Sequence, residues 1–419
     1  MWEIPNPCVK ENGETASPAE WEQQRERLKS ILAEDFYGRM PEYTGKVTGV
    51  LREEKNLWNG EALFSVYDIS CGPEGTVKFP AVLIRKPGEK GIPVCFFAGY
   101  VDEAIARQAV SRGYDIITIL TDDCAPDTPD YQKGSLYQAY PDAGFKVIAM
   151  WAWLMMRTMD WLESTDLVDT GKFVSAGHSR YGKAALCLAV YDDRIKACAA
   201  GGSGCGGMGS LRIAGSRFGK DTGTVETLGC MTGGMFPHWY ADDLPAYGAK
   251  EPGGHYKENE LRFDADFIGA AIAPKPLMIL EGLDDTWANP YGTLASWNAV
   301  SEVYAYLGQA EDCAIHFREG GHAFNLSDWA AMMDFVDERL IGKAGSGNLW
   351  HTRKPGEVRI ERSWSLVQDE APADTYDRSP EAMERLKNSL EERWAFGEAG
   401  LETGMVRFMK QILKQAGQE

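Results

Sequence analysis

The sequence lacks the features that mark most membrane, secreted and zinc-binding proteins. No stretch approaches about 18 consecutive apolar residues, which argues against a transmembrane helix. The first residues, MWEIPNPCVKENGE, contain no basic segment followed by an apolar run, so no secretory signal is visible. C-x-x-C is absent, and His255 and Glu258 form only a lone spaced pair, so we expect no metal site.

Basic residues are scarce relative to acidic ones. The 419 residues include 62 acidic and 43 basic side chains, which gives a formal net charge of −19. This excess opposes binding to nucleic acid or to an anionic membrane surface through bulk charge. We therefore expect neither of them as a partner.

The cysteines do not form a disulfide pattern. Nine are present, an odd number, and several lie inside apolar runs, such as Cys95 in IPVCFF and Cys187 in AALCLAV. Such cysteines typically behave as small buried hydrophobic residues in proteins of a reducing compartment. We expect a cytoplasmic protein, although a secreted chain without its leader would have the same pattern.

Apolar runs that suit buried strands alternate with helical segments. The expected strands span 79–85, 93–99, 114–120, 172–177, 195–201, 275–282 and 313–320, after two alternating stretches at 46–51 and 61–69. Helical periodicity covers 19–37, 102–112, 145–164, 182–191 and 292–307. This alternation predicts an α/β fold with a mostly parallel central sheet and helices on both faces.

The sequence also predicts how the chain is divided into domains. We expect a main domain at 1–344 and a partly helical appendage at 345–419, with a helix near 380–415. A Gly- and aromatic-rich insertion at about 203–272 has no strand rhythm. We expect it to lie over the top of the sheet, where it would wall a substrate pocket.

A nucleophile is predicted within KFVSAGHSRYGKAAL (172–186). Ser179 lies between a predicted strand and a helix that begins near Gly182, a turn that exposes a serine hydroxyl beside the N–H groups of a helix N-terminus. The usual G-x-S-x-G becomes G-x-S-x-x-G, with Tyr181 where the second glycine often stands. An ordinary helix N-cap is the competing interpretation. The strand–turn–helix context favours the nucleophile of an α/β-hydrolase.

The acid and the base are predicted from chain order, which in this fold is serine, acid, histidine. The predicted strand 275–282 is followed by Asp284 and Asp285, and we prefer Asp285 because it lies three residues after Gly282. His322 follows the last predicted strand in a Gly-rich loop and is the predicted base. A structural loop histidine is the alternative interpretation of His322. The remaining histidines lack this placement: His178, His238, His255, His316 and His351.

Several segments together resemble the glucuronoyl esterases, carbohydrate esterase family fifteen, especially its bacterial members. They are WEQQRERLKSILAEDFYGRMP, MWAWLMMRTMDWLE, GHSRYGKAAL, SGCGG, FPHWY, DDTWANP and EGGHAFNLSDW, in the family's order over about 20–335. The resemblance implies that Ser179 is the nucleophile and that Arg180 helps to hold the oxyanion. It also implies that Lys183 binds sugar hydroxyls and that Trp287 lines the uronate pocket. Glu226 is a weaker candidate for substrate binding.

The chain departs from the fungal pattern at one position. Fungal members have a catalytic glutamate just before the SGSGG-like segment, where this chain has Gly201 and Gly202. The resemblance therefore implies an acid from the late loop, as in many bacterial members, which supports Asp285.

The resemblance also implies a reaction. It is the hydrolysis of a 4-O-methyl-glucuronoyl ester of glucuronoxylan or lignin–carbohydrate type through an acyl-enzyme, with a small uronate ester as substrate and no cofactor. An acetylxylan-type or other carbohydrate acyl esterase is the nearest alternative. A non-catalytic binding protein with a hydrolase fold is a more remote one.

Overall fold

The structure is a computed structural model that describes residues 4–97, 101–213, 225–248, 257–282, 285–318 and 320–344. The predicted appendage at 345–419 lies outside the described residues, and so do Asp284, His255 and His351. No helix in the described ranges is long and apolar enough to cross a membrane. All nine cysteines are described as free thiols, and only Cys230 is not buried.

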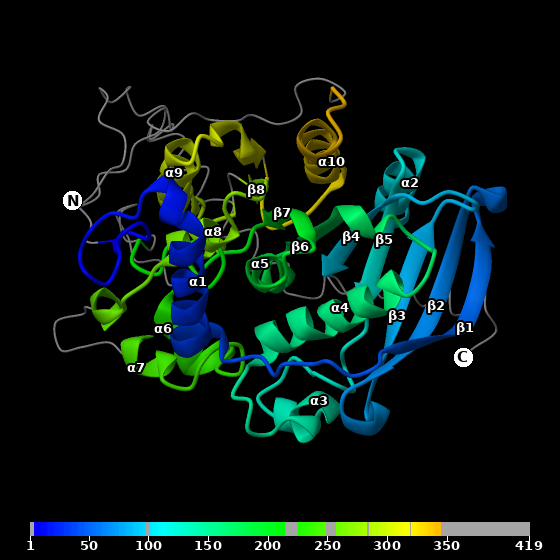
Figure 1. Cartoon of the computed structure of the whole chain (residues 1–419), viewed down its shortest axis with the longest axis horizontal. Coiled ribbons are helices and arrows are strands. Elements are labelled where there is room, and N and C mark those ends of the chain that lie inside the picture. The colour runs from blue at the N-terminus through cyan, green and yellow to red at the C-terminus, as the bar shows by residue number, and fades with distance from the viewer. Residues whose placement is uncertain are drawn as a thin grey trace.

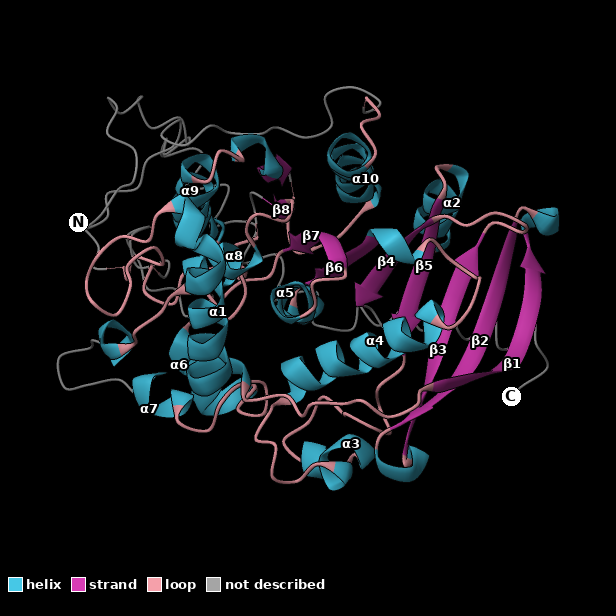
Figure 2. Ribbon diagram, viewed as in Figure 1, coloured by secondary structure: helices cyan, strands magenta, loops and turns pink. Residues whose placement is uncertain are grey.

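A single sheet of nine strands runs through the described part of the chain (Figures 1 and 2). Its order is β1-β2-β3-β5-β4-β6-β7-β8-β9. The strands are β1 (Thr48–Leu57), β2 (Ala62–Cys71), β3 (Val77–Arg85), β4 (Ile92–Phe97), β5 (Tyr114–Ile119), β6 (Phe173–His178), β7 (Ile195–Gly201), β8 (Leu277–Gly282) and β9 (Cys313–Arg318). β1, β2, β3 and β5 pair antiparallel in that order, and the pairs from β5 to β9 are parallel. The predicted mostly parallel sheet is confirmed.

Helices cover both faces of this sheet (Figure 1). They are α1 (Trp21–Leu32), α2 (Glu103–Ser111), α3 (Ser135–Ala139), α4 (Val147–Glu163), α5 (Arg180–Tyr191), α6 (Leu228–Cys230), α7 (Leu244–Gly248), α8 (Ala265–Ile272), α9 (Pro290–Tyr306) and α10 (Leu326–Leu340). One buried cluster contains side chains of α1, α4, α5, α8 and α9, and a second contains those of α2 and α10. Along β8, Leu277 and Ile279 belong to the first cluster and Met278 and Leu280 to the second, as strand alternation requires.

The predicted elements match the observed ones closely, with three informative differences. β1 is longer than the predicted strand and ends at Leu57. Its second half pairs with β2 but is mostly polar, so an alternating apolar pattern could not predict it. The predicted helix 19–37 is α1 followed by a π-helical turn, Ala33–Tyr37. α10 was not predicted, although Asn325 and Asp328 form a capping box at its start.

The strand order reverses direction between β4 and β6, which lie side by side. The chain passes from β4 outward to β5, then crosses back over β4 to β6 and continues outward to β9. In open α/β sheets, ligands bind at the carboxyl ends of the strands that flank such a reversal. The carboxyl end of β6 is therefore where a site is expected.

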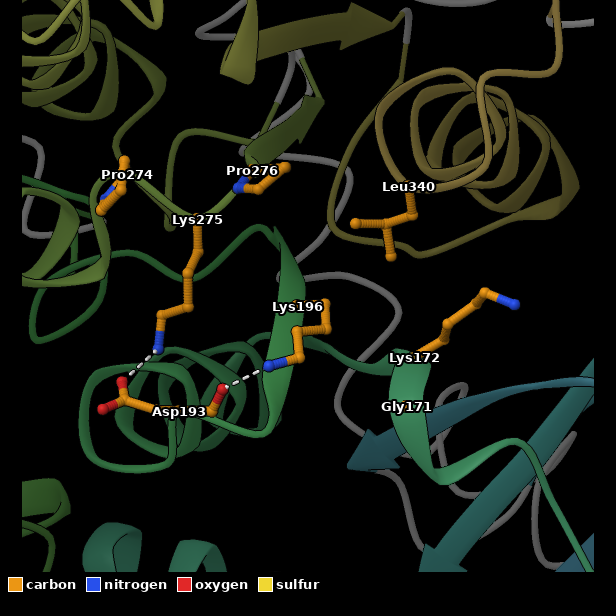
Figure 3. A pocket seen from close by; sticks show the side chains of 8 residues that line it. All are labelled: Gly171, Lys172, Asp193, Lys196, Pro274, Lys275, Pro276 and Leu340. Carbon is orange, nitrogen blue, oxygen red and sulfur yellow. Dashed lines mark hydrogen bonds and ion pairs between the residues drawn. The ribbon is translucent and has the colours of Figure 1, made fainter.

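A pocket of about 460 Å³ lies at the amino ends of the parallel strands, opposite to their carboxyl ends (Figure 3). Its lining includes Lys172 just before β6, Lys196 near the start of β7 and Lys275 just before β8. Because these are the amino ends of the strands, this pocket is not the expected site.

Candidate active site

Ser179 occupies a sharp turn between β6 and α5. Its φ of 59° and ψ of −130° are rare for a residue other than glycine. Such a conformation costs about 1–3 kcal/mol and persists only where the surrounding structure imposes it. The Ser179 N–H donates to the Gly201 carbonyl (2.9 Å), and the Ser179 carbonyl accepts from the Lys183 N–H (3.1 Å). The turn therefore holds the serine at the N-terminus of α5 and at the carboxyl end of β6.

Two glycines allow the strand and the helix to approach each other around Ser179. A Cβ on Gly177 would lie 2.3 Å from the Tyr181 carbonyl oxygen, and one on Gly182 would lie 3.1 Å from a carbonyl oxygen of β7. The Tyr181 ring instead packs against Trp151, with centroids 5.2 Å apart. The position that faces β7 is 182, not 181. The G-x-S-x-x-G spacing places a glycine there, so α5 can still pack closely against the strand.

His322 and Asp285, the predicted base and acid, meet directly. His322 Nδ1 lies 2.5 Å from Asp285 Oδ2. The buried Asp285 is itself held in place, since its N–H donates to the Gly282 carbonyl (3.0 Å) and its Oδ1 accepts from the Ala288 N–H (3.2 Å). This contact leaves the imidazole Nε2 as the proton acceptor. Within the described ranges no hydrogen bond joins the Ser179 hydroxyl to His322, and the catalytic roles of all three residues stay predictions.

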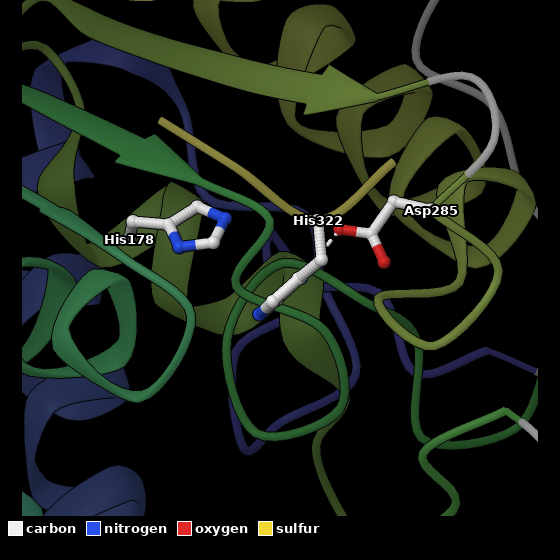
Figure 4. Close-up of side chains that lie close together, drawn as sticks. All are labelled: His178, Asp285 and His322. Carbon is white, nitrogen blue, oxygen red and sulfur yellow. Dashed lines mark hydrogen bonds and ion pairs between the residues drawn. The ribbon is translucent and has the colours of Figure 1, made fainter. Parts of the chain in front are cut away.

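His178 lies beside this pair. Its ring centroid is 4.2 Å from that of His322, and in Figure 4 the His322 side chain lies between His178 and Asp285. Since His178 immediately precedes Ser179, this contact brings the imidazole of His322 next to the turn that carries the serine.

The same three side chains could also be considered as metal ligands. His178, Asp285 and His322 each offer one ligand atom, and these atoms lie within 4.8 Å of one another. Two imidazoles and a carboxylate suit Zn²⁺. However, His322 Nδ1 is already engaged with Asp285, in the arrangement that orients a general base in serine hydrolases. The absence of a metal from the mechanism stays a prediction.

Arg180 follows the serine and is held by partners from two other segments. Its Nη1 donates to Asp127 Oδ2 (2.5 Å). Its guanidinium carbon lies 5.3 Å from the ring centroids of both Phe236 and Trp239. The side chain keeps 34% of its surface exposed, so it is fixed without being enclosed.

Lys183, Glu226 and Trp287 form a second group, one turn along α5 from the serine. Lys183 Nζ donates to Glu226 Oε2 (2.8 Å) and to the Ser203 carbonyl (2.7 Å). The Glu226 N–H donates to the Trp287 carbonyl (3.0 Å). Both ends of the ion pair are buried, and burial raises the pKa of Glu226 although Lys183 opposes this shift. These bonds use two of the three ammonium N–H donors of Lys183.

The predicted site residues fall into two groups. Ser179, Arg180 and Lys183 lie at the start of α5, and hydrogen bonds attach Glu226 and Trp287 to them. Asp285 and His322 form the second group, which reaches the serine turn through the ring of His178. The described part of the predicted insertion contributes Glu226, Phe236, His238 and Trp239, which contact Lys183, Arg180 or Asp127; that the insertion walls a substrate pocket stays a prediction. Sequence reasoning missed Asp127, which lies in an irregular loop without any periodic signal.

The sheet order, the serine on its strand–helix turn and the late aspartate–histidine pair define an α/β-hydrolase. The chain belongs to the glucuronoyl esterase family: a family model described as "Glucuronyl esterase, fungi" matches residues 71–308. It is therefore an esterase.

Relatives in sequence and structure agree with this assignment. The carbohydrate esterase MZ0003, from an unknown prokaryotic organism, is 24% identical, over 81% of this chain and 90% of that protein. The 4-O-methyl-glucuronoyl methylesterase 1 of Wolfiporia cocos is 23% identical, over 73% and 72%. A solved family 15 glucuronoyl esterase from Caldicellulosiruptor kristjansonii is 25% identical, with a TM-score of 0.69 over 84% of this chain and 97% of that one.

Proposed function

We propose that this esterase hydrolyses 4-O-methyl-glucuronoyl esters of glucuronoxylan or lignin–carbohydrate type. A relative named 4-O-methyl-glucuronoyl methylesterase 1 and a solved structure named a glucuronoyl esterase support the glucuronoyl part of this substrate. The observation that carries the proposal is the ion pair between Glu226 and Lys183 on α5, the helix that Ser179 precedes, with the Trp287 backbone bonded to Glu226. Lys183 and Glu226 offer an N–H donor and a carboxylate, which suit the hydroxyls of a sugar ring, and we expect the Trp287 ring to pack on its apolar side.

The proposed reaction passes through a covalent acyl-serine. Ser179 Oγ attacks the uronoyl carbonyl while His322 Nε2 accepts the serine proton, and Asp285 stabilises the imidazolium. The tetrahedral oxyanion is stabilised by the Arg180 backbone N–H and by its guanidinium. His322 then gives its proton to the departing alcohol. A water molecule attacks the acyl-serine, and the same residues release the uronate.

The cations near the serine favour a uronate ester over an acetyl ester. Negative charge develops on the carbonyl oxygen with either ester, and both reactions release a carboxylate. In a uronate ester, however, the sugar ring belongs to the acyl part that the serine holds, whereas in an acetylated sugar it belongs to the alcohol that leaves. Arg180 and Lys183 lie within one turn of Ser179, in a chain with a net charge of −19. An acetyl group needs only an oxyanion hole, whereas a glucuronate can also bind Lys183 through its ring hydroxyls.

The test compares benzyl glucuronate with the galacturonate ester and with an acetylated xylo-oligosaccharide. We expect the highest kcat/KM for the glucuronate ester. Lys183→Met should lower kcat/KM for this ester and leave a small aryl acetate nearly unaffected. Lys196→Met, an exposed lysine at the opposite edge of the sheet, serves as the matched control. Preference for the acetylated substrate, or equal losses on both substrates, would contradict the uronate assignment and leave only a serine esterase.

A further inference from the structure

Asp127 connects three segments that are distant in sequence. It lies in the loop that follows β5, and its two carboxylate oxygens have different partners. Oδ2 accepts from Arg180 Nη1 (2.5 Å), next to the serine. Oδ1 accepts from Trp239 Nε1 (2.7 Å) and lies 2.9 Å from His238 Nε2. This carboxylate therefore ties the residue after Ser179 to the insertion.

Two aromatic side chains of the insertion also contact the Arg180 guanidinium, which stays partly exposed. Phe236 and Trp239 stack face to face, with centroids 3.8 Å apart and an interplanar angle of 2°. The guanidinium lies within cation–π distance of both rings. Lys183 Nζ lies 5.4 Å from the Trp239 ring, so the two cations of the site share one indole. Arg180 is thus constrained by a charge and by two aromatic rings.

The surroundings of Asp127 keep its carboxyl group ionised. Burial by itself would raise the pKa of its carboxyl group. The hydrogen bonds from His238 and Trp239 and the charge of Arg180 more than compensate, and they lower the pKa to about 2. Asp127 is consequently an anion wherever an esterase of this kind would be assayed.

We propose that Asp127 is a positioning residue that holds the Arg180 guanidinium where the oxyanion develops. The inference rests on the role of Arg180 in the proposed function, and Asp127 itself touches no reacting atom. A free arginine side chain samples many rotamers, and ordering it in the transition state costs free energy. A guanidinium that is fixed beforehand stabilises the oxyanion without that cost.

The opposite effect is physically possible, which makes the sign of the result decisive. An adjacent carboxylate also weakens the field of the guanidinium, so removing it would leave a stronger positive charge beside the carbonyl. If positioning dominates, Asp127→Asn lowers kcat. If partial neutralisation dominates, Asp127→Asn leaves kcat unchanged or raises it.

The experiment measures hydrolysis of benzyl glucuronate by Asp127→Asn, Arg180→Ala and the double variant. We expect Asp127→Asn to lower kcat by about 10- to 100-fold, with a much smaller change in KM. In the Arg180→Ala background the same substitution should have little further effect, since there is no guanidinium left to position. Asp130→Asn is the matched control, because Asp130 lies in the same loop and makes only an exposed ion pair with Lys133.

A chemical rescue separates positioning from a structural role. Added guanidinium should restore part of the activity of Arg180→Ala, because Asp127 and the two rings form a ready binding site. It should restore much less in the double variant. A merely structural Asp127 would give additive losses and equal rescue in both backgrounds, and either of these results would overturn the inference.

The outcomes distinguish this inference from the proposed function. Wild-type kcat in Arg180→Ala would remove the oxyanion role of Arg180, and the inference would fail with it. An impaired Arg180→Ala beside an active Asp127→Asn would overturn the inference alone. Should Asp127→Asn fail to fold, Asp127→Glu keeps the charge and displaces it by one methylene. Unchanged kcat in Asp127→Glu would then contradict the positioning role.

Discussion

His322 Nδ1 and Asp285 Oδ2 are 2.5 Å apart, although the two residues belong to loops that follow different strands of the sheet. Asp285 comes shortly after β8 and His322 shortly after β9, and these strands are parallel neighbours. Both loops therefore begin at the carboxyl ends of the parallel strands. Ser179 follows β6 at this same end of the sheet. The contact can hold the imidazole in the tautomer that a general base requires.

Asp285→Asn should lower kcat by about two to four orders of magnitude, because an amide no longer enforces this tautomer. Asp284→Asn is the matched control and should be much milder. Steady-state kinetics on an activated ester, with Ser179→Ala as the inactive reference, would measure both. A reversed ranking would assign the acid to Asp284, and two mild variants would direct attention to Glu226.

Gly202 should not tolerate a side chain. Its φ is +47°, and a Cβ at this position would lie 2.8 Å from His178 Nε2 and 3.2 Å from Asp285 Oδ2. We expect Gly202→Ala to displace the imidazole beside His322 and to reduce kcat, with a stability loss of about 1–3 kcal/mol from the strained backbone.

Thermal unfolding and ester turnover would measure the two effects of Gly202→Ala separately. The matched control is Gly13→Ala, since Gly13 also has a positive φ (+83°) but a Cβ there would meet nothing within 4 Å. Comparable loss of kcat in both variants would show that backbone strain, and not crowding of the site, causes the effect.

The buried pair of Lys183 and Glu226 should make Lys183→Met unstable near neutral pH. Removing the ammonium leaves a buried carboxylate without its charged partner, which typically costs about 3–5 kcal/mol. Burial raises the pKa of Glu226, so protonation relieves this cost as the pH falls. The deficit should therefore shrink in acid.

Denaturant unfolding at several pH values would test this pH dependence. The double variant Lys183→Met/Glu226→Gln should recover much of the stability, because the uncompensated charge is gone. A deficit that is independent of pH and equal in both variants would mean that lost packing is responsible. The same unfolding measurements show whether Lys183→Met is folded under the conditions of the substrate test, so that a loss of activity is not mistaken for lost substrate binding.

The sequence alone predicted those parts of the molecule in which neighbouring residues form a recognisable pattern, such as an apolar run in a buried strand. Parallel strands covered on both faces produce apolar runs such as PVCFFAG and KPLMILEG, and the elbow has its own glycine spacing. His322 and Asp285 could be found because the fold fixes their order along the chain. The strands and the elbow were therefore found from local patterns, and the acid and the base from the order that the fold imposes along the chain.

The contacts that shape the site are mostly non-local. Asp127 meets Arg180 across 53 positions of sequence, and Glu226 meets Lys183 across 43. Neither acidic residue lies in a periodic segment, so its partner depends on how loops from different strands converge. The ring of His178 was not expected beside His322, because this contact depends on where the loop after β9 places His322 relative to the end of β6.

The stability of the fold should depend on pH through Asp115, far from the proposed chemistry. This β5 carboxyl group is 1% exposed, and burial raises its pKa to about 7 although the Gly91 N–H donates to it (2.8 Å). In the unfolded chain the pKa is about 3.9. The folded state therefore binds the extra proton between these two values, and its stability decreases as the pH rises through them.

We expect this single proton to lower the unfolding free energy by up to about 1.4 kcal/mol per pH unit between about pH 4 and 7. Asp115→Asn keeps an oxygen acceptor for Gly91 but cannot ionise, so its stability should fall less steeply with pH than that of the wild type. Because other groups titrate in the same range, the quantity to compare is the difference between the two slopes, measured by urea unfolding at each pH. Asp130→Asn, an exposed control, should keep the wild-type slope. Parallel curves for Asp115→Asn and the wild type would show that the carboxyl group is ionised in the folded protein throughout this range.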